Sequence, residues 1–313
     1  MASLKDIRRR IKSVKNTRKI TLAMKMVAAA KVKRAEDRLK ANRPFADELR
    51  LVFSEVYESM KNRLGELEES RYADLLLERP IKRMGVVFIS SDRGLCGSYN
   101  ANVLKFLVKY HKNCRSNGIE PKYYLLGSKL TRVFDRYCDG QRLGSQMGVM
   151  GVPTLDTCES VAKAMMKAYT DNQIDAIQIV YTHFKSMLTY QVNIQNVLPL
   201  KGEIEEIHHD IVPEEATIID TDTLRPHRSE TLLEPSATAV LDTLLPDYMA
   251  NQLYNCMLES SASELAARMT AMSNASNNAS ELIDKLTIDY NKARQASITQ
   301  EILEIVGGAE ALA

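Results

Sequence analysis

The chain has 313 residues, 45% of them hydrophobic and 26% charged, a balance typical of a folded soluble protein rather than a disordered one. No apolar run is long enough to cross a bilayer, and the amino terminus is too charged for a secretory signal peptide. The five cysteines form no CxxC pair, which favours a reducing compartment over a disulfide framework.

The net charge of +2 is unevenly distributed along the chain. Residues 1–43 contain 15 Lys and Arg against three acidic residues, so this segment carries +12 and the remainder carries −10. Such a basic block suits nucleic acid, an anionic lipid surface or an acidic protein surface. A mitochondrial presequence is a further interpretation, but the pattern continues into the following helix without a break.

Residues 1–62 are predicted to form a long coiled-coil helix, because apolar residues recur at alternating steps of three and four. The same phase lands on Arg18, Thr21 and Lys25 in the middle, where apolar residues occupy a second face, and this predicts a change of partner. Pro44 should bend the helix locally. The seam consists of Leu4, Ile7, Ile11, Val14, Val32, Ala35, Leu39, Asn42, Ala46, Leu49, Phe53, Val56 and Met60.

Residues 80–200 are predicted to form an α/β domain with a Rossmann-like, mostly parallel sheet. The strand patterns cover residues 84–90, 123–128, 175–181 and 188–198, and helical patterns cover 100–116, 129–137 and 155–169. Residues 201–235 are acidic, contain three prolines and show no sustained period, so they are predicted to form a loop or hairpin excursion.

Residues 237–313 are predicted to form a second coiled-coil helix, since 247–306 contain neither Gly nor Pro and would span roughly 90 Å as a helix. Two rods at opposite ends of the chain, joined by a compact domain, should pair antiparallel into a shaft. An ordinary amphipathic helix lying on its own domain is the alternative. Many seam positions hold Asn, Ser or Ala, which predicts close backbone approach but weak association.

The turn "SSDRGLCGSYN" at 90–100 follows the first predicted strand, where an α/β fold can hold a phosphate. Gly94 and Gly97 supply only GxxG instead of GxGxxG, so a structural turn is the favoured interpretation. Cys96 beside Arg93 is either a reactive thiol or a packed turn cysteine, and the second is favoured.

Other chemical signals are weaker. Gly127-Ser128-Lys129 shares only part of a phosphate loop, because no complete GxxxxGK[ST] occurs in the chain. His208 and His209 lie among acidic residues, and a charged surface is favoured over a metal site. Met residues at 24, 26, 269 and 272 suit seam packing. The sequence therefore predicts no catalytic residue, no metal and no cofactor.

The segment "YNKARQASITQEILEIV" at 290–306 places several polar residues off the seam. They form either an ordinary exposed face or contacts with a partner. Arg294 could then meet a carboxylate bidentately, while Gln295 and Thr299 could exchange hydrogen bonds.

Three segments, "IRRRIKSVKNTRKITLAMKMVAAAKVKRA" at 7–35, the turn at 90–100 and "NKARQASITQEILEIVGGA" at 291–309, closely resemble the gamma subunit of F-type ATP synthases. The resemblance covers nearly the whole chain. It implies a central rotor stalk that couples proton-driven rotation of a membrane ring to ATP synthesis or hydrolysis, as a non-catalytic subunit of the complex.

The resemblance also implies partners. The paired helices would enter a hexamer of alpha and beta subunits, and the α/β domain would sit on the membrane c-ring with the epsilon subunit. No nucleic acid and no small-molecule substrate of its own are implied. Residues that match family positions touching the catch loops of beta are Met24, Lys25, Arg294, Gln295 and Thr299.

The segment "ELAARMTAMSNASNNASELI" resembles the cyanobacterial and plastid lineage, but the chloroplast pair of regulatory cysteines has no counterpart in 201–235. Thiol control is therefore not expected. The implied location is the cytoplasmic face of a bacterial plasma membrane, with a thylakoid membrane as the alternative. From the residues alone, a basic coiled-coil nucleic-acid-binding protein and a Rossmann-type enzyme with a nucleotide at 93–97 stay open.

Overall fold

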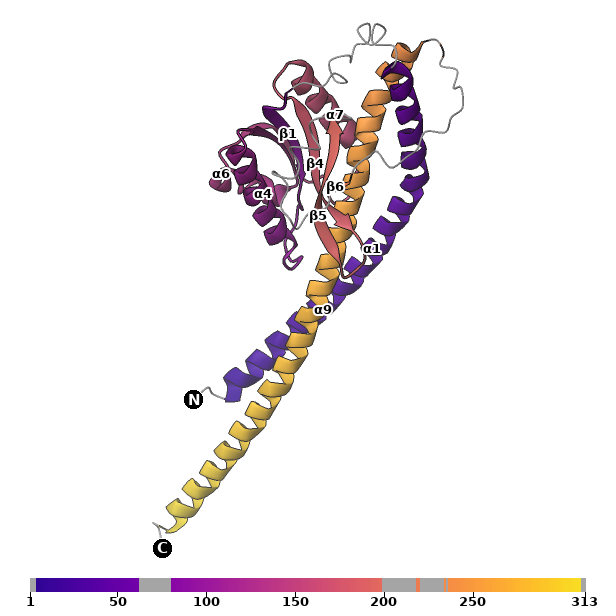
Figure 1. The fold of residues 1–313 in the computed structure, drawn as a ribbon. Helices are drawn as coiled ribbons and strands as arrows, with labels where there is room; N and C mark the ends of the chain where they lie inside the picture. The colour runs from indigo at the N-terminus through magenta and orange to yellow at the C-terminus, as the bar shows by residue number, and fades with distance from the viewer. Residues whose placement is uncertain (1–3, 62–79, 199–217, 220–233, 235, 311–313) are drawn as a thin grey trace. The chain divides into compact units, whose positions relative to one another are not determined.

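The computed structural model describes residues 4–61, 80–198, 218–219, 234 and 236–310 (Figure 1). Contacts divide the chain into two units: unit 1 combines Met1–Ala30 with Arg268–Ala313, and unit 2 is Lys31–Ala267. Helices α1 (Leu4–Lys61) and α9 (Ala237–Glu310) contribute a segment to each unit. None of the described helices is both long and apolar enough to span a bilayer.

A six-stranded sheet with the order β3-β2-β1-β4-β5-β6 forms the centre of unit 2. The first four strands in this order are parallel, β5 is antiparallel to β4, and β6 is parallel to β5. The predicted mostly parallel α/β sheet is therefore confirmed. The strands are β1 (Arg83–Ile89), β2 (Glu120–Leu126), β3 (Gln141–Gln146), β4 (Ala176–Phe184), β5 (Tyr190–Leu198) and β6 (Ile218–Ile219), and the helices between them are α4 (Tyr99–Ser116), α5 (Ser128–Thr131), α6 (Phe134–Tyr137) and α7 (Leu155–Thr170).

Two local features differ from the sequence prediction. Strand β3 is absent from it, because "QRLGSQ" lies at the sheet edge, has no fully buried residue and so carries no apolar pattern. The helix predicted at 129–137 is two separate short helices, α5 and α6, each anchored by a large buried side chain, Leu130 and Phe134. Apart from β6 and Glu234, the predicted excursion at 201–235 lies outside the described residues.

Alternating side chains of the strands build two cores on opposite faces of the sheet. Val86 and Phe88 of β1 belong to the core under α4, α5 and α6, while Val87 and Ile89 belong to the core under α7, α9 and the end of α1. The period of two in a strand produces this division. Figure 1 shows the corresponding layers, with α4 and α6 on one side of the sheet and α7 and α9 on the other.

The small residues of α9 in unit 2 serve the sheet as well as the partner helix. The ladder between β1 and β4 ends at Phe88 and Val180, and Thr182 lies two residues further on. Ser260 Oγ accepts a hydrogen bond from the Thr182 N–H at 3.0 Å, and Ser263 Oγ donates to the Thr182 carbonyl at 3.1 Å. These serines, which lie off the predicted seam, therefore take the place of a missing strand beside Thr182.

The two long helices pair as predicted. In unit 2, Phe53 stacks on Tyr248 with ring centroids 4.2 Å apart, while the earlier Val32 and Ala35 pack with the later Ala262 and Leu265. Earlier residues of α1 thus meet later residues of α9, as antiparallel helices require. In unit 1, the Arg18 guanidinium donates to Ser280 Oγ at 3.5 Å. The buried residues of α9 in that unit all lie on the predicted seam and are Met272, Ser276, Ala279, Ile283 and Leu286, and Ala28 of α1 is buried as well.

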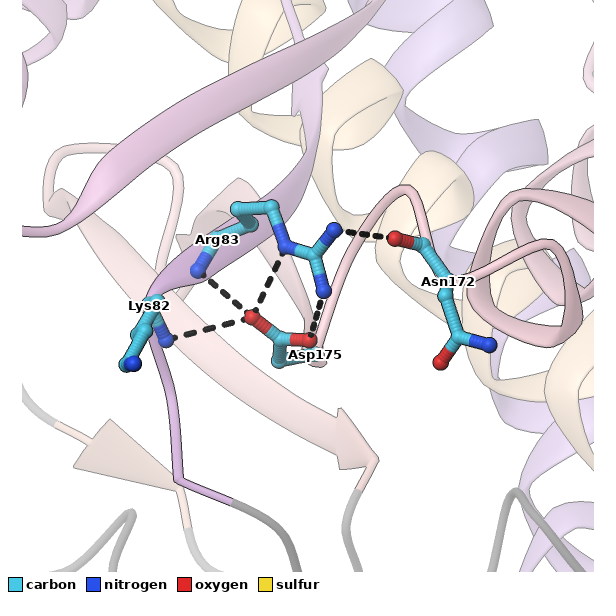
Figure 2. A network of polar contacts seen from close by, with 4 residues as sticks. All are labelled: Lys82, Arg83, Asn172 and Asp175. Carbon is cyan, nitrogen blue, oxygen red and sulfur yellow. Dashed lines mark hydrogen bonds and ion pairs between the residues drawn. The ribbon is translucent and has the colours of Figure 1, made fainter.

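A buried carboxylate joins the amino ends of β1 and β4 (Figure 2). Asp175 Oδ2 accepts hydrogen bonds from the backbone N–H groups of Lys82, at 3.2 Å, and of Arg83, at 2.8 Å. The Arg83 guanidinium adds a bidentate pair, at 2.7 Å to Oδ1 and 3.1 Å to Oδ2, and also donates to the carbonyl of Asn172. Burial opposes the charge, but these bonds outweigh it and lower the pKa of Asp175.

We predict that Asp175→Ala lowers the free energy of unfolding by about 2–3 kcal/mol, because charge-assisted bonds are lost and two backbone N–H groups lose their acceptor. Asp171→Ala, an exposed neighbour, is the matched control and should change stability by less than about 0.5 kcal/mol. Urea unfolding monitored by circular dichroism measures both variants. Equal effects of the two substitutions would contradict this role for Asp175.

Candidate functional site

The carboxyl edge of the parallel strands is where a doubly wound fold usually binds its ligand. Here the loops after β1, β2 and β3 meet around the carboxylate of Asp92. Its Oδ1 accepts the N–H and the hydroxyl of Ser128, at 2.9 and 2.8 Å, and the Gly148 N–H at 2.7 Å. Its Oδ2 accepts the Met150 N–H at 2.9 Å. One side chain therefore joins three loops.

These donors are the kind that would otherwise hold a phosphate. Burial disfavours the charged form of Asp92, but the hydrogen bonds from Gly148, Met150 and Ser128 outweigh it and lower the pKa of this carboxyl below its ordinary value. Asp92 is consequently ionised at neutral pH. The position that an anionic ligand would occupy is taken by a charge of the chain itself.

The residues that partly match a phosphate loop have a packing role. Gly127 has φ +98°, and a Cβ at this position would lie 2.3 Å from the Ser90 carbonyl oxygen. Only glycine permits such an approach between the ends of β1 and β2. Ser90 Oγ in turn donates to the Leu126 carbonyl at 2.9 Å, which holds the two strand ends together.

The four residues singled out in the turn at 93–97 lie together at this edge. The Arg93 carbonyl accepts hydrogen bonds from Ser91 Oγ at 2.8 Å and from Asn100 Nδ2 at 3.2 Å, while the Arg93 side chain is exposed. Cys96 is 2% exposed, and its Sγ accepts Asn100 Nδ2 at 3.0 Å. Gly97 has φ +57°, whereas Gly94 has room for a Cβ beside Lys129. These contacts shape a compact turn.

Sequence reasoning missed Asp92 and Leu95 in the same turn. Leu95 has φ +64°, a left-handed conformation that costs a branched residue roughly 1–2 kcal/mol, and its side chain is 66% exposed. Met147, Val152 and Leu155, in the loop after β3 and at the start of α7, are also exposed. The signal for Asp92 was available, because an acidic residue lies three positions after the last residue of a buried strand, at the end of the sheet where loops converge.

The cysteines are not placed for redox or nucleophilic chemistry. All five are buried and free. Burial raises the pKa of Cys114 and Cys158 to about 12 and that of Cys138 to about 11, and it also raises the pKa of Cys256. Thiols of this kind are protonated and inert at neutral pH.

One cluster resembles a catalytic relay in its connections. His111 Nδ1 lies 3.0 Å from the Tyr123 hydroxyl, and His111 Nε2 lies 2.7 Å from Asp139 Oδ1. Tyr123, however, is fully buried, and burial raises its pKa well above the ordinary value. The cluster therefore connects α4 to the segment before β3, and it offers no accessible nucleophile. Within the described ranges no group of His, Cys, Asp and Glu is arranged to hold a metal, and His208 and His209 lie outside them.

The five predicted shaft contacts all belong to unit 1, in two separate places. Met24 and Lys25 of α1 are half-buried, while Arg294, Gln295 and Thr299 of α9 are exposed. Extending the register of the Arg18–Ser280 contact puts Lys25 beside α9 about 20 residues before Arg294, a separation of roughly 30 Å. The Thr299 hydroxyl donates to the carbonyl of Gln295 at 2.9 Å, within its own helix.

The same register brings Leu4, where the described part of α1 begins, beside Arg294. Figure 1 shows α9 continuing beyond this point. Its last turns expose five large apolar side chains, by 47–71%, namely Ile298, Ile302, Leu303, Ile305 and Val306. A second exposed apolar group on α1 consists of Ile20, Leu22, Met26 and Val27, on the extra face that the sequence predicts.

Comparison with known proteins gives a consistent result. A family model described as ATP synthase matches residues 3–312. The ATP synthase gamma chain of Nostoc punctiforme is 42% identical over 321 residues, and that of Nostoc sp. is 42% identical over 327, each alignment covering all of both chains. These relatives provide no support for a nucleic-acid-binding protein.

Solved structures agree in fold. A chain from the central stalk and c-ring of the Tetrahymena thermophila mitochondrial ATP synthase has a TM-score of 0.55 and 28% identity, covering 82% of this chain and 99% of that chain. A chain of the Euglena gracilis mitochondrial ATP synthase rotor has a TM-score of 0.59 and 21% identity, covering 94% and 98%. The second likeness concerns the fold alone.

We predict that Asp92→Asn lowers the free energy of unfolding at pH 7 by about 1.5–3 kcal/mol. Because the folded pKa of Asp92 is depressed, its contribution is complete above about pH 4 and is lost as pH falls through the folded value. The difference between wild type and variant should therefore shrink in acid. Asp135→Asn, which loses only a surface ion pair with Arg142, is the control for denaturant titrations across pH. A difference that is constant down to pH 3 would contradict the assignment.

Proposed function

The chain belongs to the family of ATP synthase gamma chains, and from this premise we propose that it is the central stalk of an F-type ATP synthase. In this role the stalk couples rotation of a proton-driven membrane ring to ATP synthesis or hydrolysis at sites on beta subunits. The proposed partners are the alpha and beta subunits, the epsilon subunit and the c-ring. The proposed location is the cytoplasmic face of a bacterial plasma membrane or a thylakoid membrane.

The observation that carries this proposal is the apolar end of α9. Five large apolar side chains are exposed within nine residues of α9, and each costs roughly 1 kcal/mol or more in water. They are favourable only where a partner covers them. The exposed residues do not share one narrow stripe of the helix. A partner with an apolar opening that surrounds the end of α9 would therefore cover all of them.

The polar residues next to this end give the contact its specificity. Arg294, Gln295 and Thr299 stand exposed where the described part of α1 begins opposite α9, and we assign them to a catch loop of a beta subunit. Met24 and Lys25, about 30 Å along the shaft, are assigned to a second beta contact. An Arg can bind a carboxylate bidentately, which suits an acidic partner loop.

The mechanism requires a shaft without threefold symmetry. Two unlike helices meet this need, because three equivalent sites around them face different side chains at any instant. Each site can be shifted only by the difference in contact free energy between orientations. Two contact zones far apart on one shaft spread this coupling over many residues.

The sheet-containing region is proposed as the foot that grips the ring and the epsilon subunit. Its exposed Leu95, which is held in a strained conformation, and the exposed Met147 and Val152 of the loop after β3 have the character of a docking surface. The division into 1–62, 80–200, 201–235 and 237–313 stays part of the proposal, since its boundaries border residues outside the described ranges.

We further propose that this chain contributes no catalytic residue of its own. At the edge where a Rossmann-type enzyme would hold a nucleotide, Asp92 engages the N–H donors of Ser128, Gly148 and Met150. Tight, saturable binding of ATP by the isolated chain would contradict this part of the proposal.

Reconstitution with alpha and beta subunits tests the central proposal. We expect a stable complex with one copy of this chain per hexamer and an ATPase activity that depends on its presence. Analytical ultracentrifugation gives the stoichiometry, and a coupled assay gives the rate. Failure of the folded chain to enter the complex would remove the proposal.

Deletion of residues 294–313 should lower ATP-driven proton pumping per ATP hydrolysed, because the exposed end of α9 and its polar contacts are lost together. Thermal unfolding of the sheet should not change, since no residue of the sheet or its cores is removed.

Arg294→Gln should lower the coupled rate by severalfold, roughly the effect of 1–2 kcal/mol. Lys292→Gln, an exposed basic neighbour, is the matched control. Equal effects of the two point variants would argue against a specific contact at Arg294.

A further inference from the structure

A cavity of about 320 Å³ opens between α4 and β5 on the face of the sheet away from α7. This volume is in the range of small-molecule sites. Apolar and aromatic side chains form its walls: Val103 and Phe106 from α4, and Tyr190 and Val192 from β5. The whole cavity belongs to unit 2.

The mouth of the cavity is cationic. Lys105 and Lys109 are four residues apart on α4, so their side chains lie on one face of the helix and border the same opening. Neither lysine has an ion pair with another described residue. A third ammonium, that of Lys185, donates to Gln191 Oε1 of the lining at 3.0 Å.

Two residues with hydroxyl groups, Thr182 and Tyr99, lie at the floor of the cavity. Thr182 is 1% exposed, and its Oγ1 makes no hydrogen bond of normal length within the described residues, although it lies close enough to the Tyr99 hydroxyl to affect the pKa of Tyr99. The Tyr99 hydroxyl donates a hydrogen bond of 3.3 Å to the Ser260 carbonyl. The carboxylate of Glu264, on α9, contributes to raising the pKa of Tyr99 but does not line the cavity. Thr182 and Tyr99 close the inner end of the cavity beneath its apolar walls.

We propose that this cavity is a binding site for a small aromatic anion, a function separate from the stalk. The anionic group, a carboxylate, phosphate or sulfonate, pairs with Lys105 and Lys109 at the mouth. The aromatic body lies between Phe106 and Tyr190, where ring stacking adds to apolar burial.

The test uses 8-anilinonaphthalene-1-sulfonate, an aromatic sulfonate whose fluorescence rises in an apolar site, and its neutral analogue N-phenyl-1-naphthylamine. The full-length chain should bind the sulfonate saturably at one site. Lys105→Glu with Lys109→Glu should weaken that binding by about tenfold or more and leave the neutral analogue within about threefold. Lys163→Glu with Lys167→Glu, an equally spaced exposed pair on α7, is the control and should change neither probe by more than about twofold.

Val192→Trp provides an independent test by filling the cavity, and it should reduce binding of both probes. If this variant unfolds, the lysine variants decide alone, because both side chains are exposed and their replacement leaves the core intact. The proposal is overturned if the full-length chain binds no sulfonate saturably. It is equally overturned if the α4 and α7 lysine pairs have the same effect, since the probe would then bind elsewhere, for example on the apolar end of α9.

Discussion

The structure depends on the contact between α9 and the end of β4. Thr182 lies beyond the last residue that β1 pairs with, so its N–H and carbonyl need partners that no strand supplies. Ser260 and Ser263 of α9 supply both. Because α9 is one uninterrupted helix from Ala237 to Glu310, this contact anchors to the sheet the same element that forms half of the shaft. Larger side chains at the serine positions would hold the helix backbone too far from the strand for these bonds.

Other contacts extend the same anchor. Ser261 Oγ donates to the Met150 carbonyl at 3.2 Å, and the Met150 N–H is bound by Asp92. Met150 thus connects the hydrogen bonds around Asp92 to α9. At the last residues of β4, Glu259 of α9 contacts His183 and accepts a hydrogen bond from the Phe184 N–H at 3.3 Å. A helix held by several directional bonds is held in one rotation about its axis, which is what a torque-bearing element needs.

At both ends of the parallel strands, a carboxylate of the chain accepts the hydrogen bonds that a ligand or a water molecule accepts in other folds. Asp175 ties the strand starts, and Asp92 ties the loops after the strand ends. In each case burial alone would raise the pKa, and hydrogen bonds reverse the direction. A scaffold whose loops are fixed internally can use its surface for partners instead of substrates, in agreement with the function proposed from the family.

The sequence by itself determined the two long helices, their seam, the strands β1, β2, β4 and β5 and the helices α4 and α7, because these follow from periods of 3.5 and 2 that are local. It also located the exposed apolar face of α1 around Met26. Only the tertiary structure decided that the serines of α9 bind β4, that Asp92 takes the donors of three loops, and that β3 completes an edge. The contacts of the serines and of Asp92 join residues more than 30 positions apart, such as Asp92 and Ser128 or Thr182 and Ser260, which no local pattern connects. Strand β3 has no apolar pattern of its own, and only its pairing with β2 identifies it. The cavity between α4 and β5 has the same origin, since neither element carries a binding motif and the opening exists only where their surfaces meet.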